Sequence, residues 1–319
     1  MPSIIEFTHP GCQLKMRNGS RVNDAYHYTN PSRTEGIRYW NSDGGHYRKF
    51  IHGNAILEGS GGYQEVCFWG EWEAQSRFRL LNNTDKFVPS AIHCPFLDTT
   101  QIGYHNTDPF VFGNRFYYSN CKQKSKRILR AIENFSMILF GTEYAAGFAL
   151  DTVFVVQSSR SAREYFNNCA EYPEPFRWMA ADHHDLYIEN PTFRLYHGLM
   201  ERDGDEMYSF VPCKRVQDCE NGFPRPLLDF DRFNLQSPGA RTVCTDITRG
   251  RDILKFWEEL RQYLHDQGCQ LATQIEMPPY ETVEGLPMAK IGNNDTGSGT
   301  ATQPNAGCSR VRQKRRRGC

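Results

Sequence analysis

Two short segments in the first half of the chain combine aromatic rings with charged groups. Residues 46–50 read HYRKF, and residues 68–73 read FWGEWE. Indole rings offer flat surfaces for stacking a base, and carboxylates accept hydrogen bonds from exocyclic amines or ribose hydroxyls. In a strand, alternation would place Trp69, Glu71 and Glu73 on one face. The candidate ligand-binding and catalytic residues of the two segments are His46, Arg48, Lys49, Trp69, Glu71 and Glu73.

The same side chains also have a structural interpretation. In it, Phe68 and Trp72 fill the core, while the two glutamates face water or pair with the neighbouring arginine and lysine. A catalytic interpretation is open as well, because Glu71 and Glu73 could serve as general acid and base on a nucleotide or glycosidic bond. The sequence alone does not decide among these alternatives.

A third polar and aromatic segment covers residues 104–123, YHNTDPFVFGNRFYYSNCKQ. The run Asn-Thr-Asp-Pro is typical of a turn, so one alternative is a loop capped by its own Asx side chains. The other is an ordered loop in which His105, Asn106 and Asp108 recognise a base edge or a ribose. In that case we expect Trp69 and Asn106 to line one cavity, which would be largely apolar with a few placed polar groups.

The order of elements around this loop is similar to that of a known family. HNTDPFVFG is followed by a basic segment, then by FSMILFGT and GFALDTVFVV. Over residues 104–156 this order resembles the nucleotide-modification-associated domains, which are linked to DNA base hypermodification. The departures are the inserted Thr107, Phe112 in place of a tyrosine, and Thr142 where the family usually has an acidic residue. The resemblance implies a nucleotide-linked role.

The signatures of several enzyme classes are missing from the sequence. No GxGxxG, GxxxxGK[ST], GxSxG or HExxH motif occurs, and the Cys and His residues do not form the two spaced pairs of a zinc site. We therefore predict no metal site and identify no cofactor. LYHGLM at 195–200 and the Glu71–Glu73 pair suggest an ADP-ribosyltransferase-like enzyme as one alternative, although their order along the chain is the reverse of that fold.

Charge is distributed unevenly along the chain. The formal net charge is zero, yet residues 310–318 carry six basic residues and no acidic one, which leaves 31 basic against 37 acidic residues elsewhere. Non-specific duplex binding relies on a cationic face. We therefore expect any nucleotide or nucleic-acid partner to be bound in a pocket, or by the tail, which could also contact another anionic partner.

The chain shows no membrane or export signal. No apolar run approaches the roughly 20 residues of a membrane helix, and the start lacks a basic segment followed by a long apolar one. The eleven cysteines are odd in number and have no compact spacing, so we expect free thiols in a reducing compartment. The prediction is a cytoplasmic protein without a membrane partner, or a nuclear one if the basic tail is an import signal in a eukaryote.

The candidate residues must be positioned by a fold in which strands outnumber helices. Residues 63–75 and 269–277 read as strands, and residues 136–142 with 148–156 read as a hairpin. A second hairpin is expected between residues 193–200 and 206–213. Helices are expected at residues 252–267 and 122–135.

Neighbouring strands of this kind favour an α+β protein, mainly antiparallel, with a curved sheet or partly closed barrel and flanking helices. Residues 1–60 are expected to be mostly loop-like. We predict one globular domain over residues 1–290, with a sub-boundary near 157–192, and a disordered basic tail over 291–319.

These observations lead to one main functional hypothesis. In this hypothesis the protein recognises a nucleotide or modified base. The hypothesis extends to a role accessory to nucleic-acid base modification. The alternatives are the acid–base enzyme described above and a protein-interaction module whose aromatic residues belong to the core.

Overall fold

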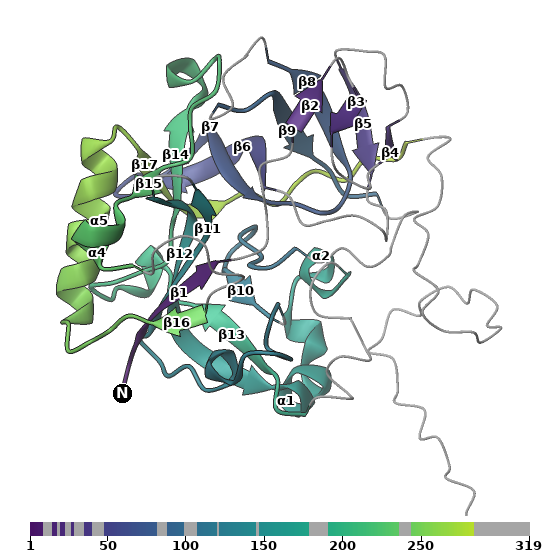
Figure 1. Ribbon diagram of the computed structural model, residues 1–319. Helices are drawn as coiled ribbons and strands as arrows, with labels where there is room; N and C mark the ends of the chain where they lie inside the picture. Colours follow the sequence, from purple (N-terminus) through teal and green to yellow (C-terminus); the bar gives the residue numbers. More distant parts are fainter. Residues whose placement is uncertain are drawn as a thin grey trace, which may run out of the picture.

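The computed structural model describes most of the first 283 residues (Figure 1). The described ranges are residues 1–8, 15–17, 20–22, 27–28, 35–39, 48–81, 88–98, 107–119, 121–144, 147–178, 191–235 and 244–283. They form two sheets and a separate strand pair, β2 (Lys15–Arg17) with β3 (Ser20–Val22).

The first sheet is built around the long strand β12. In spatial order its strands are β10 (Tyr117–Tyr118), β13 (Arg194–Gly198), β12 (Gly147–Ser161), β11 (Met137–Tyr144), β1 (Ile4–Thr8) and β16 (Cys244–Asp246), with β15 (Leu227–Leu228) also paired to β12. Only β1 with β11 is a parallel pair among its described strands. The predicted hairpin of β11 and β12 is confirmed.

The second sheet contains a closed barrel. Its strands follow the order β17 (Gln270–Ile275), β14 (Val211–Arg215), β7 (Tyr63–Glu71), β6 (Arg48–Leu57), β9 (Ala91–Pro95), β8 (Ser76–Leu80), β5 (Glu35–Tyr39) and β4 (His27–Tyr28). Because β17 also pairs with β6, four of these strands close on themselves. The prediction of a mainly antiparallel α+β protein with a partly closed barrel and flanking helices is confirmed.

From Val66 onward both faces of β7 are buried, so alternation along this strand divides these residues between two apolar clusters. Phe68 belongs to the largest core cluster, which also includes Ile5 and Phe140 of the first sheet. Trp69 belongs to a smaller cluster with Phe50. The largest cluster therefore contains residues of both sheets, and a second large cluster joins the first sheet to buried residues 256–264.

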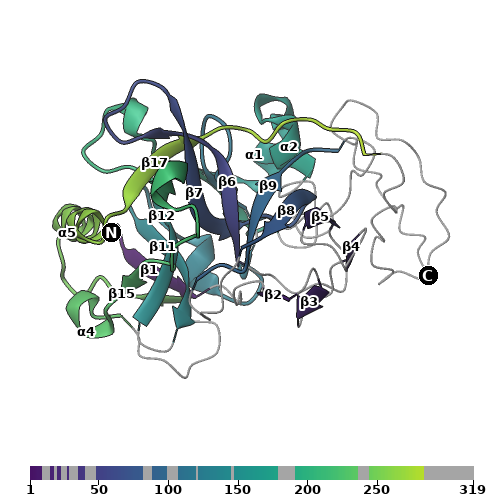
Figure 2. The same ribbon diagram turned by 90° about the horizontal axis from the view of Figure 1, so that it is seen from above.

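The main helix, α5 (Ile253–Asp266), packs on the first sheet, because its buried residues share an apolar cluster with residues of β1, β11, β12 and β15, and it lies away from β4 and β5 (Figures 1 and 2). The Asp252 carboxylate accepts a hydrogen bond from the Lys255 amide at 3.1 Å, and Gly268, at φ 72°, follows the helix. Leu260 and Leu264 are fully buried on its inner face. The helix expected at 252–267 is confirmed.

The remaining helices are short. The α-helices are α1 (Ala162–Asn167), α2 (Glu174–Phe176) and α4 (Phe230–Phe233). The 3₁₀ helices are η2 (Arg127–Arg130), η3 (Cys169–Glu171), η5 (Glu201–Asp203) and η6 (Val216–Asp218). None of these is long enough to form a layer of its own.

Three sequence expectations are wrong. The helix predicted at 122–135 is a run of turns with only η2, and it is bounded by Lys122 and Phe135, whose φ angles of 62° and 63° cannot continue a helix. The predicted second hairpin does not form, because β13 pairs in the first sheet and β14 in the second. The expectation that residues 1–60 are mostly loop fails for the part that the structure describes, which is mainly strand and contains the buried strand β1 and the ten-residue strand β6.

Strand β12 carries two β-bulges. The register opposite β11 skips Asp151, and the register opposite β13 skips Gln157. A bulge adds one residue to a strand and redirects a side chain. At both positions the redirected polar side chain binds an arginine, as described below.

Candidate functional site

Two arginines and two carboxylates are buried where the two sheets meet. Arg48 on β6 binds Glu71 on β7 through Nη1 and binds Asp151 on β12 through Nε. The second oxygen of Asp151 lies 2.7 Å from Nη2 of Arg225. Each of the four residues is at most 4% exposed. The network therefore links the sheets through charges that water does not reach.

The balance of charges determines the state of Arg48. Burial alone would lower the pKa of its guanidinium, but Asp151 and Glu71 raise this pKa by more, so the net shift is upward. Its Nη2 is buried and has no hydrogen-bond partner among the described residues. Arg48 thus remains a cation whose orientation is fixed by two carboxylates.

A second buried ion pair lies next to the first along the chain. Lys49 Nζ is 3.1 Å from Glu73 Oε1, and the two residues are 1% and 0% exposed. Since Lys49 follows Arg48 on β6, the two cations project to opposite faces of the strand. Glu71 and Glu73 therefore bind different cations instead of forming a carboxylate pair in one pocket.

The structural interpretation of this region is confirmed. Phe68 and Trp72 are fully buried in the largest core cluster, and each glutamate pairs with a neighbouring cation. Trp69 is also in the core, at 2% exposure, and its indole N–H donates to the Phe223 carbonyl at 2.9 Å. Phe50 packs on the indole with 5.4 Å between ring centroids. Stacking of a base on Trp69 would require this ring to become exposed.

The end of β7 is tied to the polar loop by a hydrogen bond from the backbone. The Glu73 amide donates to the Thr107 hydroxyl at 3.1 Å, and Thr107 is fully buried. Next to it, Asp108 accepts from the amides of Ser119 at 2.9 Å and Cys121 at 2.7 Å. The loop is capped by an Asx side chain, as one of the two sequence interpretations predicted. Asp108, at 0% exposure, holds the loop and does not face solvent.

Three of the candidate residues lie outside the described residues: His46, His105 and Asn106. The prediction that Trp69 and Asn106 line one cavity is therefore not tested. What the structure does place together are the segments that carry the candidates, through the contact of Glu73 with Thr107.

Two members of the ion network, Asp151 and Arg225, were missed by the sequence analysis. The signal for Asp151 was visible, because it is the one charged residue within the apolar run FALDTVFVV. A charge in a buried strand needs a partner, which is what the bulge provides. Arg225 lies in a loop between short elements, and its sequence context gives no comparable signal.

A separate chain of hydrogen bonds connects the first sheet to its short helices. His197 on β13 contacts Ser158 through Nδ1 at 3.1 Å and Tyr172 through Nε2 at 2.9 Å. Burial, together with the positive charges of Arg160 and Arg115, lowers the pKa of His197 to about 4. The imidazole is therefore neutral at pH 7. Arg115, in turn, donates to Gln157, the residue of the second bulge, at 2.6 Å.

The described residues contain no group of three or more His, Cys, Asp or Glu side chains that could hold a metal ion. Among the described cysteines the free thiols are Cys67, Cys94, Cys121, Cys213, Cys219, Cys244 and Cys269. Cys169 is in a disulfide, so the expectation of free thiols fails at this position. Within the described part of the chain, no helix is long and apolar enough to span a membrane.

No family model, curated protein or solved structure matches this chain.

Proposed function

We propose that this protein recognises a nucleotide or modified base through the polar loop of residues 104–121. The observation that carries the proposal is the hydrogen bond from the Glu73 amide to the Thr107 hydroxyl. It joins the two segments of the sequence that combine aromatic and polar groups. The residues directly before Thr107 are His105 and Asn106, whose side chains suit the hydrogen-bonding edges of a base.

The buried ion pairs support this role as a frame. Placing six charged side chains in the interior is expensive, and apolar residues of the same volume would often be at least as stabilising. Their advantage is a fixed orientation, because each ion must meet its partner. A recognition loop gains affinity when its supporting residues are held rigidly before the ligand arrives. In this proposal Lys49, Glu73 and Asp108 position the loop, and they do not touch the ligand.

In this proposal Glu71 and Glu73 have a supporting role and do not act in acid–base catalysis. Each carboxylate is within an ion pair and at most 4% exposed, so it would have to leave a buried cation to reach a substrate. A general acid or base must lie within hydrogen-bond reach of the proton that it transfers. A role accessory to base modification fits recognition without turnover, and it extends our proposal to modified bases as ligands.

Calorimetric titration of the full chain tests the proposal. The panel is made of the common ribonucleosides and deoxyribonucleosides, their monophosphates, 5-substituted pyrimidines, N6-substituted adenosines and short single-stranded oligonucleotides. We expect saturable binding of at least one member, and at least a fivefold loss of affinity in Asn106→Ala, since a lost bidentate base contact costs roughly 1 to 3 kcal/mol.

The matched control is Asn167→Ala. Asn167 is an exposed asparagine on α1, far along the chain from the loop. The Asn167→Ala variant should bind the ligand with the affinity of the native protein. The proposal is wrong if no member of the panel binds, or if Asn106→Ala and Asn167→Ala bind equally well. In either case a protein-interaction module with aromatic core residues becomes the better account.

A further inference from the structure

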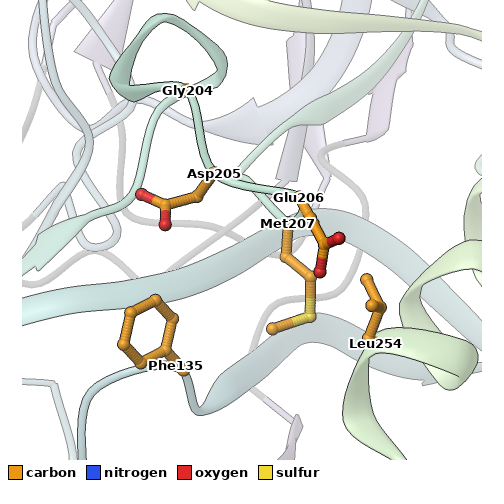
Figure 3. A pocket seen from close by; sticks show the side chains of 6 residues that line it. All are labelled: Phe135, Gly204, Asp205, Glu206, Met207 and Leu254. Carbon is orange, nitrogen blue, oxygen red and sulfur yellow. The ribbon is translucent and has the colours of Figure 1, made fainter.

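A shallow pocket lies on the surface beside the N-terminal end of α5, apart from the polar loop (Figure 3). Its volume is about 330 Å³, near the lower limit for sites that bind small groups. The lining residues come from three separate segments and are Phe135, Gly204, Asp205, Glu206, Met207 and Leu254. Nothing in the proposed nucleotide site uses them.

The pocket combines an apolar floor with two carboxylates. Figure 3 shows Met207 between Phe135 and Leu254, with the side chains of Asp205 and Glu206 nearby. Both acidic residues are exposed, and neither forms an ion pair with another described residue. The pocket therefore has acidic side chains at its rim and apolar side chains beneath them.

Phe135 is unusual on this surface. It is 46% exposed, although large apolar side chains are normally buried. Its backbone has a φ of 63°, a conformation that bulky residues rarely adopt. The ring is thus held open to solvent at the edge of the pocket, where a partner could cover it.

A lysine or arginine side chain has the chemistry that this pocket would accept. Its aliphatic stem can lie on Met207 and Leu254 while its charged head reaches the carboxylates. The face of Phe135 can also attract the cation. An anion such as a nucleotide would be repelled by Asp205 and Glu206, which distinguishes this pocket from the proposed nucleotide site.

We propose that the occupant is this chain's own basic segment, residues 310–317, RVRQKRRR. The charges of the segment and of the rest of the chain are complementary. The segment holds six basic residues, whereas the rest of the chain has 31 basic against 37 acidic residues. The intervening residues 284–309 span up to about 90 Å when extended, so reach is not limiting. Exposed ion pairs are individually weak. Tethering compensates, because a segment on the same chain has a millimolar effective concentration.

Zero-length cross-linking of the full chain tests the proposal. Lys314 carries the one primary amine in the basic segment. A water-soluble carbodiimide activates a carboxylate, and an amine in contact with it then forms an amide. Peptide mass spectrometry should find Lys314 joined to Asp205 or Glu206 as its main product. The double substitution Asp205→Asn and Glu206→Gln should reduce the total yield of Lys314 cross-links at least fivefold.

The matched control is Asp218→Asn with Glu220→Gln, another exposed acidic pair two residues apart, outside the pocket. This variant should keep the native yield. A mixture of ¹⁵N-labelled and unlabelled chains should give cross-links within one chain. The proposal is overturned if Lys314 is cross-linked evenly over the acidic surface or not at all, if both variants behave alike, or if the products join two chains, in which case a second copy is the occupant.

Discussion

At the scale of single residues, the pair of Arg48 and Glu71 tests what the buried network contributes. Glu71→Gln removes the negative charge that Glu71 presents to Arg48, and Arg48 is only 1% exposed. Breaking a buried pair from one side leaves an uncompensated ion and costs roughly 3 to 5 kcal/mol. We expect urea unfolding to show a loss in this range.

The comparison variant is Glu171→Gln. Glu171 also pairs with an arginine, Arg160, at 2.8 Å, but its side chain is 57% exposed. Such surface pairs contribute about 0 to 1 kcal/mol. Equal losses of unfolding free energy in the two variants would show that the Arg48 network is not stabilised by its burial as we describe.

His197 should make stability depend on pH in a defined window. Its folded pKa of about 4 lies below the ordinary value of 6.5, so the unfolded chain binds more protons between these values. The stability associated with the neutral imidazole is complete above pH 6.5 and decreases as the pH falls towards 4. Between pH 7 and pH 5 we expect a loss of about 1 to 2 kcal/mol that His197→Gln lacks. Urea unfolding of both proteins at the two pH values measures it, and parallel losses would contradict it.

The sequence predicted the partner of a residue only where that partner is near in the sequence. The pairing of Glu71 and Glu73 with Arg48 and Lys49 was among the alternatives, because the segments HYRKF and FWGEWE are close in the sequence. The partner of Asp151 could not be assigned, because Asp151 reaches Arg48 only through a bulge and the contact between two sheets. No periodicity in the sequence encodes that meeting.

At the scale of elements, the first bulge of β12 depends on Gly141 of β11. A Cβ atom at this position would come within 2.4 Å of the Ala149 carbonyl and of the Phe148 ring. Gly141→Ala should therefore disturb the pairing that directs Asp151 inward. We expect a loss of roughly 2 kcal/mol or more in the free energy of unfolding, as for other overpacked sites.

The control for this prediction is Gly61→Ala in the loop between β6 and β7. A Cβ at Gly61 meets no atom within 4 Å, and no positive φ requires glycine there. The change should stay within about 0.5 kcal/mol. The role of the bulge would be contradicted if Gly141→Ala were as mild as Gly61→Ala in urea unfolding.

The elements that the sequence predicts well are those with complete local signals. Helix α5 has its apolar stripe, its Asp252 cap and Gly268, and the hairpin of β11 and β12 joins two apolar runs. The expected pairing of β13 with β14 fails because both prefer distant partners in different sheets. Strand β6 was overlooked because it begins with the polar residues Arg48 and Lys49, which are buried through the ion pairs that they form.

At the scale of the whole molecule, the basic tail should add little to the stability of the core. Residues 291–319 have no hydrophobic periodicity that would bury apolar area. Deleting them should change the melting temperature by no more than about 2 °C, and weak docking of a few exposed charges is compatible with this. A drop of several degrees in a calorimetric scan would show that the tail packs extensively on the body.

In our proposal, the polar loop of residues 104–121, supported by the buried ion pairs, recognises a nucleotide. The most direct measurement is ultraviolet cross-linking of the full chain to an oligonucleotide that contains 5-bromouracil, followed by mass spectrometry of the linked peptide. We expect the label to attach within residues 104–121 and the unmodified oligonucleotide to compete with it. Labelling that is competed but confined to another part of the chain, or no labelling that competition reduces, would show that the loop does not bind the nucleotide.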